Sequence, residues 1–219
     1  MEHRESGKRL AEIRARIASA ATSAGRDPAE ITLIAVSKTY PVDRIRTMYE
    51  LGVRDFGESK LQEAIPKIAA LPHDIHWHFI GHLQSNKVRA VAQSFGTIHT
   101  LSTESALREL HKAPKMPNVF TEVNSAAEPQ KSGLLPAEVE AFVGRLREMP
   151  SVRWMGLMTM GPATDDLSTT LRYFRETSHL NAALGGKSLS MGMSADFECA
   201  IQEGATHVRV GSALFGPRG

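Results

Sequence analysis

ITLIAVSKTYPVDRIRTMYE, residues 31–50, contains the pattern that decides the fold. Its first seven residues, 31–37, are mainly β-branched or apolar, which favours a buried strand. Pro41 then stands where we expect the first helical position, and apolar residues follow at helical spacing. A buried strand followed at once by a helix is a βα unit, from which parallel sheets are built.

The same alternation continues along the chain, and no internal repeat, low-complexity tract or long linker interrupts it. Thr103 as a cap, and Pro136 with Glu138 behind it, mark two further helix starts. The expected strands are residues 31–37, 53–56, 76–80, 97–101, 119–123, 152–157, 188–190 and 207–210.

Eight βα units of about 24 residues each suit a compact (β/α)8 TIM barrel with right-handed crossovers. An open doubly wound sheet is the alternative, but it would ordinarily carry a glycine-rich turn after the first strand, where this chain has Ser37-Lys38-Thr39. We therefore expect an α/β protein with one barrel domain over residues 1–219, preceded by an extra helix within residues 1–26. One face of that helix carries Leu10, Ile13 and Ile17.

The composition is that of an ordinary globular domain: 42% of residues are hydrophobic and 23% are charged, which excludes a disordered or fibrous chain. The net charge is +2 with no basic run, so we expect no nucleic-acid partner. Cys199 is the one cysteine, so no internal disulfide can form and a reducing cytoplasm fits. No stretch is apolar enough for a signal peptide or a membrane span, so we expect a cytoplasmic protein without a membrane partner.

Lys38 is the first candidate for chemistry. Alternation along the first strand places it on the same face as Ile34 and Val36, at the carboxyl end, where barrels carry out their reactions. Partial desolvation would lower the pKa of the amine and let it attack an aldehyde as a Schiff-base nucleophile. The simpler interpretation is a strand-end lysine that points to solvent.

Two turns near the end of the chain have the character of anion sites. In SMGMSAD, residues 190–196, Ser194 is placed to cap a helix, whose amino end would attract a phosphate. In VRVGS, residues 208–212, Gly211 allows close approach of the backbone and Ser212 adds a hydroxyl donor. Barrels often bind phosphate in the loops after strands seven and eight. Ordinary capping and turn formation are the alternative for each motif.

Histidines invite a metal interpretation that we do not adopt. His76 and His78 share a strand face, with His73 and His82 nearby. A pair of this kind without a clear third ligand or carboxylate partner more often packs in the core, so we expect no metal. Three polar residues lie at or after the fifth strand: Glu122, Asn124 and Lys131. They face either the barrel mouth or a solvated loop.

Several long motifs, in this order along the chain, resemble the YggS/PROSC family of pyridoxal phosphate (PLP) homeostasis proteins. The motifs are ITLIAVSKT, FGES, HFIGHLQSNK, EVNSAAEPQKSG, GLMTMGP, LSMGMSADFECAI and VRVGSALFG. The resemblance spans about residues 31–218. It implies a PLP fold type III barrel related to the amino-terminal domain of alanine racemases. It also implies a PLP-binding protein, a monomer or weak dimer, that acts in PLP and amino-acid homeostasis, with PLP-dependent apoenzymes as recipients of the cofactor.

The residues that the resemblance implies for cofactor binding are Lys38, Ser59, Met193, Ser194, Arg209, Gly211 and Ser212. Lys38 would form the internal aldimine, and the two serine–glycine turns would hold the phosphate. Arg209 would face the pyridine nitrogen. An arginine there donates a hydrogen bond without protonating the ring, which weakens the electron sink that carbanion chemistry needs.

One motif departs from the family. The family usually reads FGEN followed by an aromatic residue, with the asparagine beside the PLP 3-hydroxyl, whereas this chain has Ser59 and Lys60. Ser59 could still donate a hydrogen bond with a shorter reach, while Lys60 brings a charge where a ring would stack. We expect PLP to bind, though less tightly than in relatives.

Three functions compete. The favoured one is a PLP carrier or regulator without robust catalysis. The second is a weak amino-acid racemase that uses Lys38 as one base; it would need a second proton donor, for which Tyr40 is the one tyrosine near the mouth. The third is a sugar-phosphate enzyme without PLP, in which Lys38 attacks a ketone.

Overall fold

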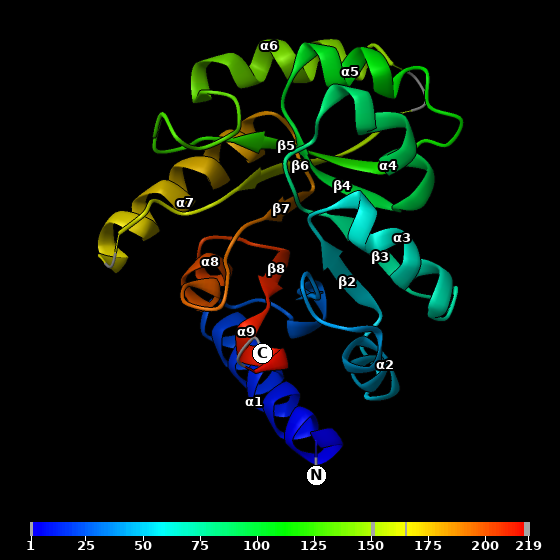
Figure 1. Ribbon diagram of the computed structural model, residues 1–219. Helices are drawn as coiled ribbons and strands as arrows, with labels where there is room; N and C mark the ends of the chain where they lie inside the picture. The colour runs from blue at the N-terminus through cyan, green and yellow to red at the C-terminus, as the bar shows by residue number, and fades with distance from the viewer. Residues whose placement is uncertain (1, 150–151, 165, 217–219) are drawn as a thin grey trace.

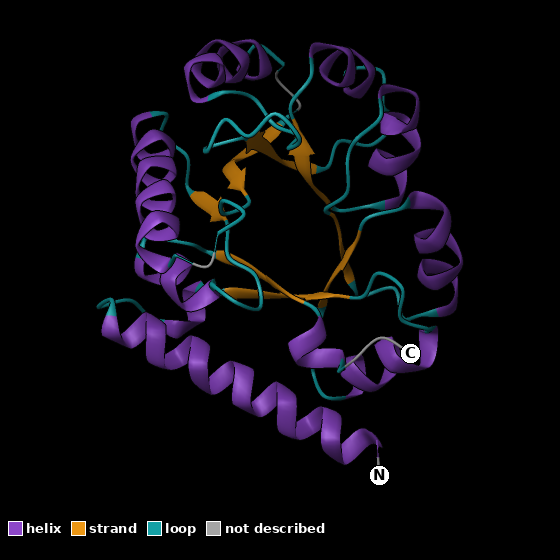
Figure 2. Ribbon diagram, turned by 60° about the vertical axis from the view of Figure 1, so that its left-hand side comes forward, coloured by secondary structure: helices purple, strands orange, loops and turns teal. Residues whose placement is uncertain are grey.

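The computed structural model describes residues 2–149, 152–164 and 166–216. Its strands close into one barrel in which each strand pairs in parallel with the next along the chain and the last pairs with the first (Figure 2). The predicted (β/α)8 barrel is confirmed. The strands are β1 (Thr32–Val36), β2 (Asp55–Glu58), β3 (His76–Phe79), β4 (Thr97–Leu101), β5 (Asn118–Val123), β6 (Arg153–Thr159), β7 (Ser188–Ser190) and β8 (His207–Val210).

Helices surround the barrel on its outer side (Figures 1 and 2). They are α1 (Glu2–Ser23), α2 (Val42–Glu50), α3 (Leu61–Ala70), α4 (Val88–Ser94), α5 (Glu104–Leu110), α6 (Pro136–Arg147), α7 (Leu167–Ala183), α8 (Phe197–Gln202) and α9 (Ser212–Phe215), with short 3-10 turns η1 (Pro28–Glu30) and η2 (Ser85–Lys87). The alternation of strand and helix gives this layered ring, because each strand needs a helix to cover its outer face.

The helix-start signals are confirmed at two places and corrected at one. The Thr103 side chain accepts a hydrogen bond from the Ala106 N–H at 3.2 Å, and Pro136 opens α6. Pro41 precedes α2 instead of opening it: its ψ of 163° is extended, and its carbonyl accepts the first helical hydrogen bonds. The proline ring fixes φ alone, so it is as compatible with the capping position as with the first turn.

The predicted strand boundaries hold to within about two residues. β2 begins later than expected because the Val53 N–H bonds back to the Met48 carbonyl at 3.0 Å and closes the turn after α2. It also extends further, since Gly57 pairs with Val36 on one side and with His78 on the other.

α1 lies outside the ring and packs against α8 and α9 (Figure 1). The predicted apolar face of this helix is buried, with exposed fractions of 5% or less at Leu10, Ile13 and Ile17. Within the part of the chain that the structure describes, no helix is both long and apolar enough to cross a membrane.

Two separate regions are buried. One is the apolar layer between the sheet and the helices. The other is the inside of the barrel, to which we assign four buried apolar residues that lie apart from that layer: Ile34, Val36, Phe120 and Met158. Buried polar side chains share this interior, and they determine the chemistry of the molecule.

Candidate functional site

The loops that sequence motifs single out meet at the carboxyl-end mouth of the barrel. Strand β1 lies beside β8, with Ala35 opposite Val210. The Arg209 N–H donates to the Gly192 carbonyl at 3.0 Å, which joins β8 to the loop after β7. A Cβ atom on Gly211 would lie 3.5 Å from the Val36 Cβ. The turn that carries Lys38 and both anion-type turns therefore share one rim.

Lys38 itself lies in a half-buried turn directly after β1. Its amine makes no hydrogen bond or ion pair with the described residues. Thr39, which follows, has φ of 71°, a left-handed conformation that a threonine adopts only under local constraint. The sharp bend after the strand thus leaves a free amine at the mouth.

A buried network braces this turn from behind. The Ser37 hydroxyl donates to Glu58 Oε1 at 2.6 Å, and the Lys67 amine donates to the same oxygen at 2.8 Å and to the Ser37 carbonyl at 3.0 Å. Glu58 is fully buried, and its second oxygen, Oε2, has no partner among the described residues. The network fixes the ends of β1 and β2 to α3. This network was not predicted from the sequence, in which the glutamate of FGES is its one visible signal.

The loop after β7 corrects one sequence expectation. Ser194 does not cap a helix: it lies in the turn before α8, which starts at Phe197 behind Asp196. The reason is that Asp196 Oδ1 accepts the Met193 N–H at 2.6 Å and closes this turn. The Met193 N–H would have to exchange that carboxylate for a phosphate oxygen in order to bind an anion. Gly192, at φ of 90°, brings the loop so close to α8 that a Cβ would lie 2.6 Å from the Ala200 Cβ.

The hydroxyl groups of Ser194 and Ser212 are available as donors at this mouth. Ser194 is half-buried and Ser212 is exposed at the start of α9, and neither hydroxyl has a hydrogen-bond partner among the described residues. The Gly211 carbonyl accepts from the Leu214 and Phe215 N–H groups, which folds the chain back under the turn. Among the described residues, the Lys38 amine and the Ser194 and Ser212 hydroxyls are therefore free to meet a ligand at this mouth.

Ser59 and Lys60 lie beside the same rim, after β2. The Ser59 carbonyl packs against Gly81, where an added Cβ would come within 1.9 Å of it, so only glycine fits there. Lys60 is exposed and donates to Glu63 at 2.8 Å, a hydrogen bond that raises the lysine pKa. Its charge is thus paired with the Glu63 carboxylate on α3.

Arg209 lies inside the barrel with 5% of its surface exposed. Its Nη1 donates to Ser190 Oγ at 2.7 Å and its Nη2 donates to the Thr159 carbonyl at 3.0 Å. Burial lowers the pKa of Arg209 to about 10, while Asp196 and Glu122 act in the opposite direction. The guanidinium stays charged at neutral pH, with N–H groups to spare.

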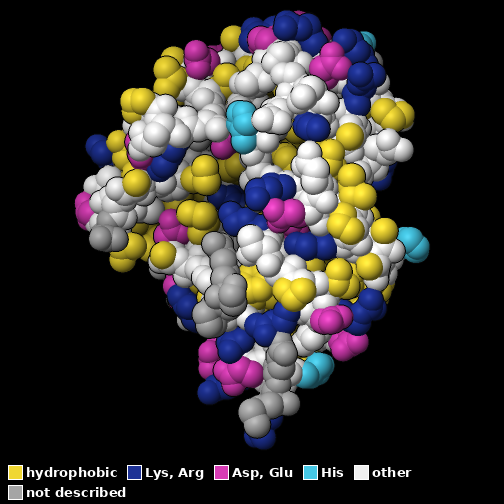
Figure 3. All heavy atoms as spheres, viewed as in Figure 1, with side chains coloured by type: hydrophobic (Ala, Val, Ile, Leu, Met, Phe, Trp, Pro, Cys, Tyr) yellow, Lys and Arg dark blue, Asp and Glu magenta, His cyan; other side chains and the backbone are white. Residues whose placement is uncertain are grey.

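The three polar residues of the β5 region have different surroundings. Glu122 is buried, which raises its pKa to about 7 against the opposing charge of Arg209. Asn124 Nδ2 donates to the Glu128 carbonyl at 2.8 Å, and Lys131 donates to Glu128 Oε1 at 2.8 Å. Asn124 and Lys131 therefore brace the loop, while Glu122 lies in the field of Arg209. Figure 3 shows basic and acidic side chains gathered near the middle of the face it presents, over the barrel.

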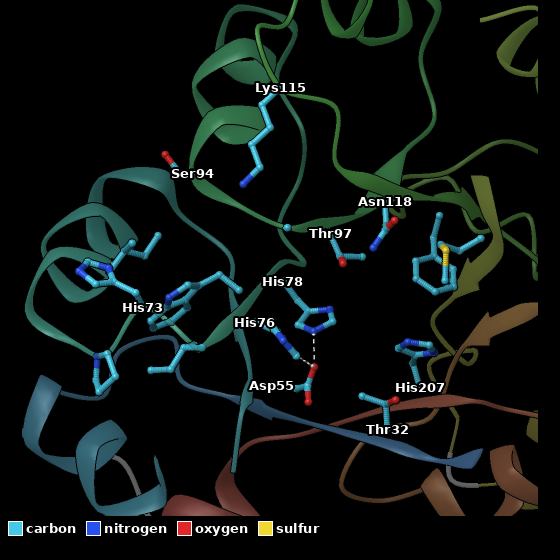
Figure 4. A pocket seen from close by; sticks show the side chains of 17 residues that line it. Thr32, Asp55, His73, His76, His78, Ser94, Thr97, Lys115, Asn118 and His207 are labelled. Atoms are coloured by element: carbon cyan, nitrogen blue, oxygen red, sulfur yellow. Dashed lines mark hydrogen bonds and ion pairs between the residues drawn. The ribbon is translucent and has the colours of Figure 1, made fainter. Parts of the chain in front are cut away.

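The opposite, amino-end mouth contains a cavity of about 500 Å³ (Figure 4). His76 and His78 both contact Asp55 Oδ1, at 3.4 and 3.0 Å, so the pair has the carboxylate partner that the sequence did not reveal. Burial opposes the charge on Asp55, yet the hydrogen bonds from these histidines bring its pKa below its ordinary value. No group of three metal-ligating side chains occurs within the described ranges.

Comparisons with known proteins relate this chain to one family of proteins. A family model described as the alanine racemase N-terminal domain matches residues 9–219. The pyridoxal phosphate homeostasis proteins of Pseudomonas aeruginosa and Escherichia coli K12 are 43% and 40% identical to this chain; the match covers 95% of this chain in each case, and 94% and 95% of those proteins.

Solved structures of PipY from Synechococcus elongatus PCC7942 are also similar to this chain. The structure without PLP has a TM-score of 0.86 at 34% identity, covering 96% of this chain and 99% of that one. The structure with PLP bound has a TM-score of 0.81 at 33% identity, covering 96% and 100%.

Proposed function

The chain belongs to the YggS/PROSC family of pyridoxal phosphate homeostasis proteins, and from this premise we propose that it binds PLP at the carboxyl-end mouth of its barrel. The observation that carries the proposal is the meeting, at one rim, of the free Lys38 amine with the free hydroxyls of Ser194 and Ser212. An aldehyde and a phosphate at two ends of one small molecule match that donor set.

Each residue has a distinct role in this proposal. Lys38 would supply the amine that condenses with the aldehyde to an aldimine, and the aldehyde oxygen would leave as water. The turns that carry Ser194 and Gly211 donate to the phosphate, and the Met193 N–H joins them once Asp196 releases it. Ser59 lies on the side of the ring hydroxyl. PLP supplies an electrophilic carbon and a pyridine ring that can accept electrons.

Arg209 is the residue that favours holding PLP over using it. Its guanidinium is a permanent donor and places no proton on a ring nitrogen, so the ring is a weak electron sink. We propose that the protein keeps a reactive aldehyde sequestered in the cytoplasm, influences PLP and amino-acid pools, and passes the cofactor to PLP-dependent apoenzymes as a monomer or weak dimer.

Tyr40 is poorly placed as the second proton donor of the racemase alternative. The Tyr40 hydroxyl donates to the Gly216 carbonyl at 2.7 Å, and the ring stacks on Phe215 at 4.6 Å. A tyrosine whose proton and ring are both engaged is poorly placed to serve a substrate carbon. We therefore keep the carrier as the favoured function.

Chemical trapping tests the proposal. PLP added to the protein should give absorption at about 420 nm, as a lysine–PLP imine does. Borohydride reduction followed by peptide mapping should label Lys38. Lys38→Ala should abolish the label, while Lys60→Ala, a neighbouring exposed lysine, should retain it. A label on another lysine would refute the assignment, and phosphate binding without the absorption would favour the sugar-phosphate enzyme.

A further inference from the structure

A continuous line of buried polar side chains runs through the barrel below Arg209. Arg209 Nη1 lies 2.7 Å from Ser190 Oγ, which lies 2.9 Å from His99 Nδ1. His99 Nε2 lies 2.9 Å from His78 Nδ1, and His78 Nε2 lies 3.0 Å from Asp55 Oδ1. Strands β2, β3, β4, β7 and β8 each contribute one residue to this line. Figure 4 shows its lower end, His78 and Asp55, at the amino-end cavity.

The two ends of the line fix the direction of every hydrogen bond in it. Arginine can only donate, so Ser190 accepts from Arg209 and gives its own proton to His99 Nδ1. His99 then carries its proton on Nε2 and donates to His78. His78 in turn carries its proton on Nε2 and donates to the Asp55 carboxylate, which can only accept. Each residue of the line therefore donates a hydrogen bond to the next, from the Arg209 cation to the Asp55 anion.

The opposite orientation leaves a buried group without a partner. If His99 carried its proton on Nδ1, Ser190 would receive two donors, and its own hydroxyl proton would face no acceptor among the described residues. Ser190 is fully buried, so that loss is costly. His78 would also have to become a cation, inside the same barrel as Arg209.

Burial and the neighbouring basic groups favour a neutral His99 ring. Burial lowers the pKa of His99 well below 6.5, and the nearby His78, His207 and Arg209 act in the same direction. His207 faces both histidines, with ring centroids 6.4 Å from His78 and 6.2 Å from His99. Other titratable groups lie near the two ends of the line. His76 contacts Asp55 at the lower end, where His73 and Lys115 also line the cavity. Glu122 and Asp196 lie near Arg209 at the upper end.

We propose that this line is an interior relay, with all its hydrogen bonds pointing one way, that positions the Arg209 guanidinium at the carboxyl-end mouth. The interior relay consists of Arg209, Ser190, His99, His78 and Asp55. Ser190 acts directly on Arg209, while the two histidines and Asp55 fix the proton on the ring that Ser190 contacts. The interior relay would hold Arg209 opposite the pyridine nitrogen of bound PLP. This consequence rests on the proposed function.

Histidine tautomers in the protein without PLP test the interior relay directly. Long-range proton–nitrogen NMR of nitrogen-15-labelled histidine distinguishes a proton on Nε2 from one on Nδ1. At pH 7.5, both His78 and His99 should be neutral with the proton on Nε2, and His78→Gln and His99→Gln assign the signals. A proton on His99 Nδ1, or a charged His99, would overturn the assignment.

Substitution of Ser190 tests the positioning role. Ser190→Ala removes the acceptor of Arg209 Nη1, so PLP affinity should fall by at least about tenfold, as expected for loss of a hydrogen bond to a charged group. Thr177→Val is the matched control, because it removes another buried hydroxyl, whose bond is to the Tyr173 carbonyl on α7. The control should change PLP affinity by less than about twofold, and Ser190→Thr should restore most of the loss.

The outcomes separate the two proposals. Wild-type affinity in Ser190→Ala, or equal losses in Ser190→Ala and Thr177→Val, would refute the positioning role. If Ser190→Ala fails to fold, Ser190→Cys replaces it, since a thiol keeps the volume but accepts weakly. If the wild type does not bind PLP, the proposed function fails, and the exchange rate of the Arg209 Nη protons, slow in the wild type and faster in Ser190→Ala, decides the positioning role.

Discussion

Glu122 is a buried carboxyl whose charge depends on pH near neutrality. Burial raises its pKa from 4.5 to about 7, with Arg209 opposing. A raised carboxyl pKa means that the folded state holds its proton more tightly, so this contribution to stability is complete below pH 4.5 and is lost as pH rises through 7. The full difference corresponds to roughly 3 kcal/mol.

Glu122→Gln should therefore stabilise the protein at alkaline pH. The neutral amide avoids a buried charge, so urea unfolding at pH 8 should show a gain of roughly 1–3 kcal/mol over the wild type. At pH 4 the two proteins should be nearly equal, because the wild-type carboxyl is mostly protonated there in both the folded and the unfolded state. A difference that is the same at both pH values would contradict the proposed cause.

The Glu58–Lys67 pair makes a second prediction about single residues. Lys67→Met leaves the fully buried Glu58 carboxylate with the Ser37 hydroxyl alone, so the free energy of unfolding should fall by about 3–5 kcal/mol. Adding Glu58→Gln removes the uncompensated charge and should recover part of that loss. Urea unfolding of both single variants and the double variant measures the coupling, and strictly additive losses would show that the two side chains do not act as a pair.

Helix α1 allows a prediction about one element. Ile13 is 3% exposed and lies in the apolar layer that joins α1 to the ring. Ile13→Ala should therefore lower the free energy of unfolding by about 2–4 kcal/mol. Glu12→Ala, on the exposed face of the same helix, should change it by less than about 0.5 kcal/mol. Equal effects in thermal or urea unfolding would mean that α1 does not stabilise the barrel by packing.

The existence of the elements could be predicted from the sequence, and some of their ends could not. Buried parallel strands leave dense apolar runs, so all eight strands were visible. Helix ends depend on single hydrogen bonds. A serine before a helix predicts a cap, but the Asp196 carboxylate took the Met193 N–H instead, and helix α8 began three residues after Ser194. The helix start predicted at Pro41 was wrong by one residue, because the proline ring fixes φ but not ψ, and the extended ψ of 163° places Pro41 at the capping position.

At the scale of the whole molecule, the predictable part of the site follows from topology. Loops after adjacent parallel strands must share a rim, so the sequence alone predicts that the motifs at Lys38, Ser194 and Gly211 meet. Side-chain pairs across the barrel could not be predicted in this way. The bond from His78 to Asp55 and the bond from Lys67 to Glu58 depend on register and on which side of a strand faces inward, which a single sequence does not fix.

The histidines inside the barrel make the stability of the whole molecule sensitive to acid. Burial lowers the pKa of His207 from 6.5 to about 4, and that of His99 is also well below 6.5. The unfolded chain therefore binds these protons first, so their contribution is complete above pH 6.5 and is lost as pH falls toward 4. For His207 alone this corresponds to roughly 3 kcal/mol.

Glu122 masks part of this dependence, because its contribution grows as pH falls over the same range. In the Glu122→Gln background, calorimetry from pH 7 to pH 4 should therefore show a steeper fall in Tm than in the wild type. Adding His207→Gln should flatten the fall, since the protein then carries one fewer buried base. A Tm that stays level from pH 6.5 to 4 in the Glu122→Gln background would mean that the interior histidines are solvated in the folded protein and that the barrel does not keep them neutral.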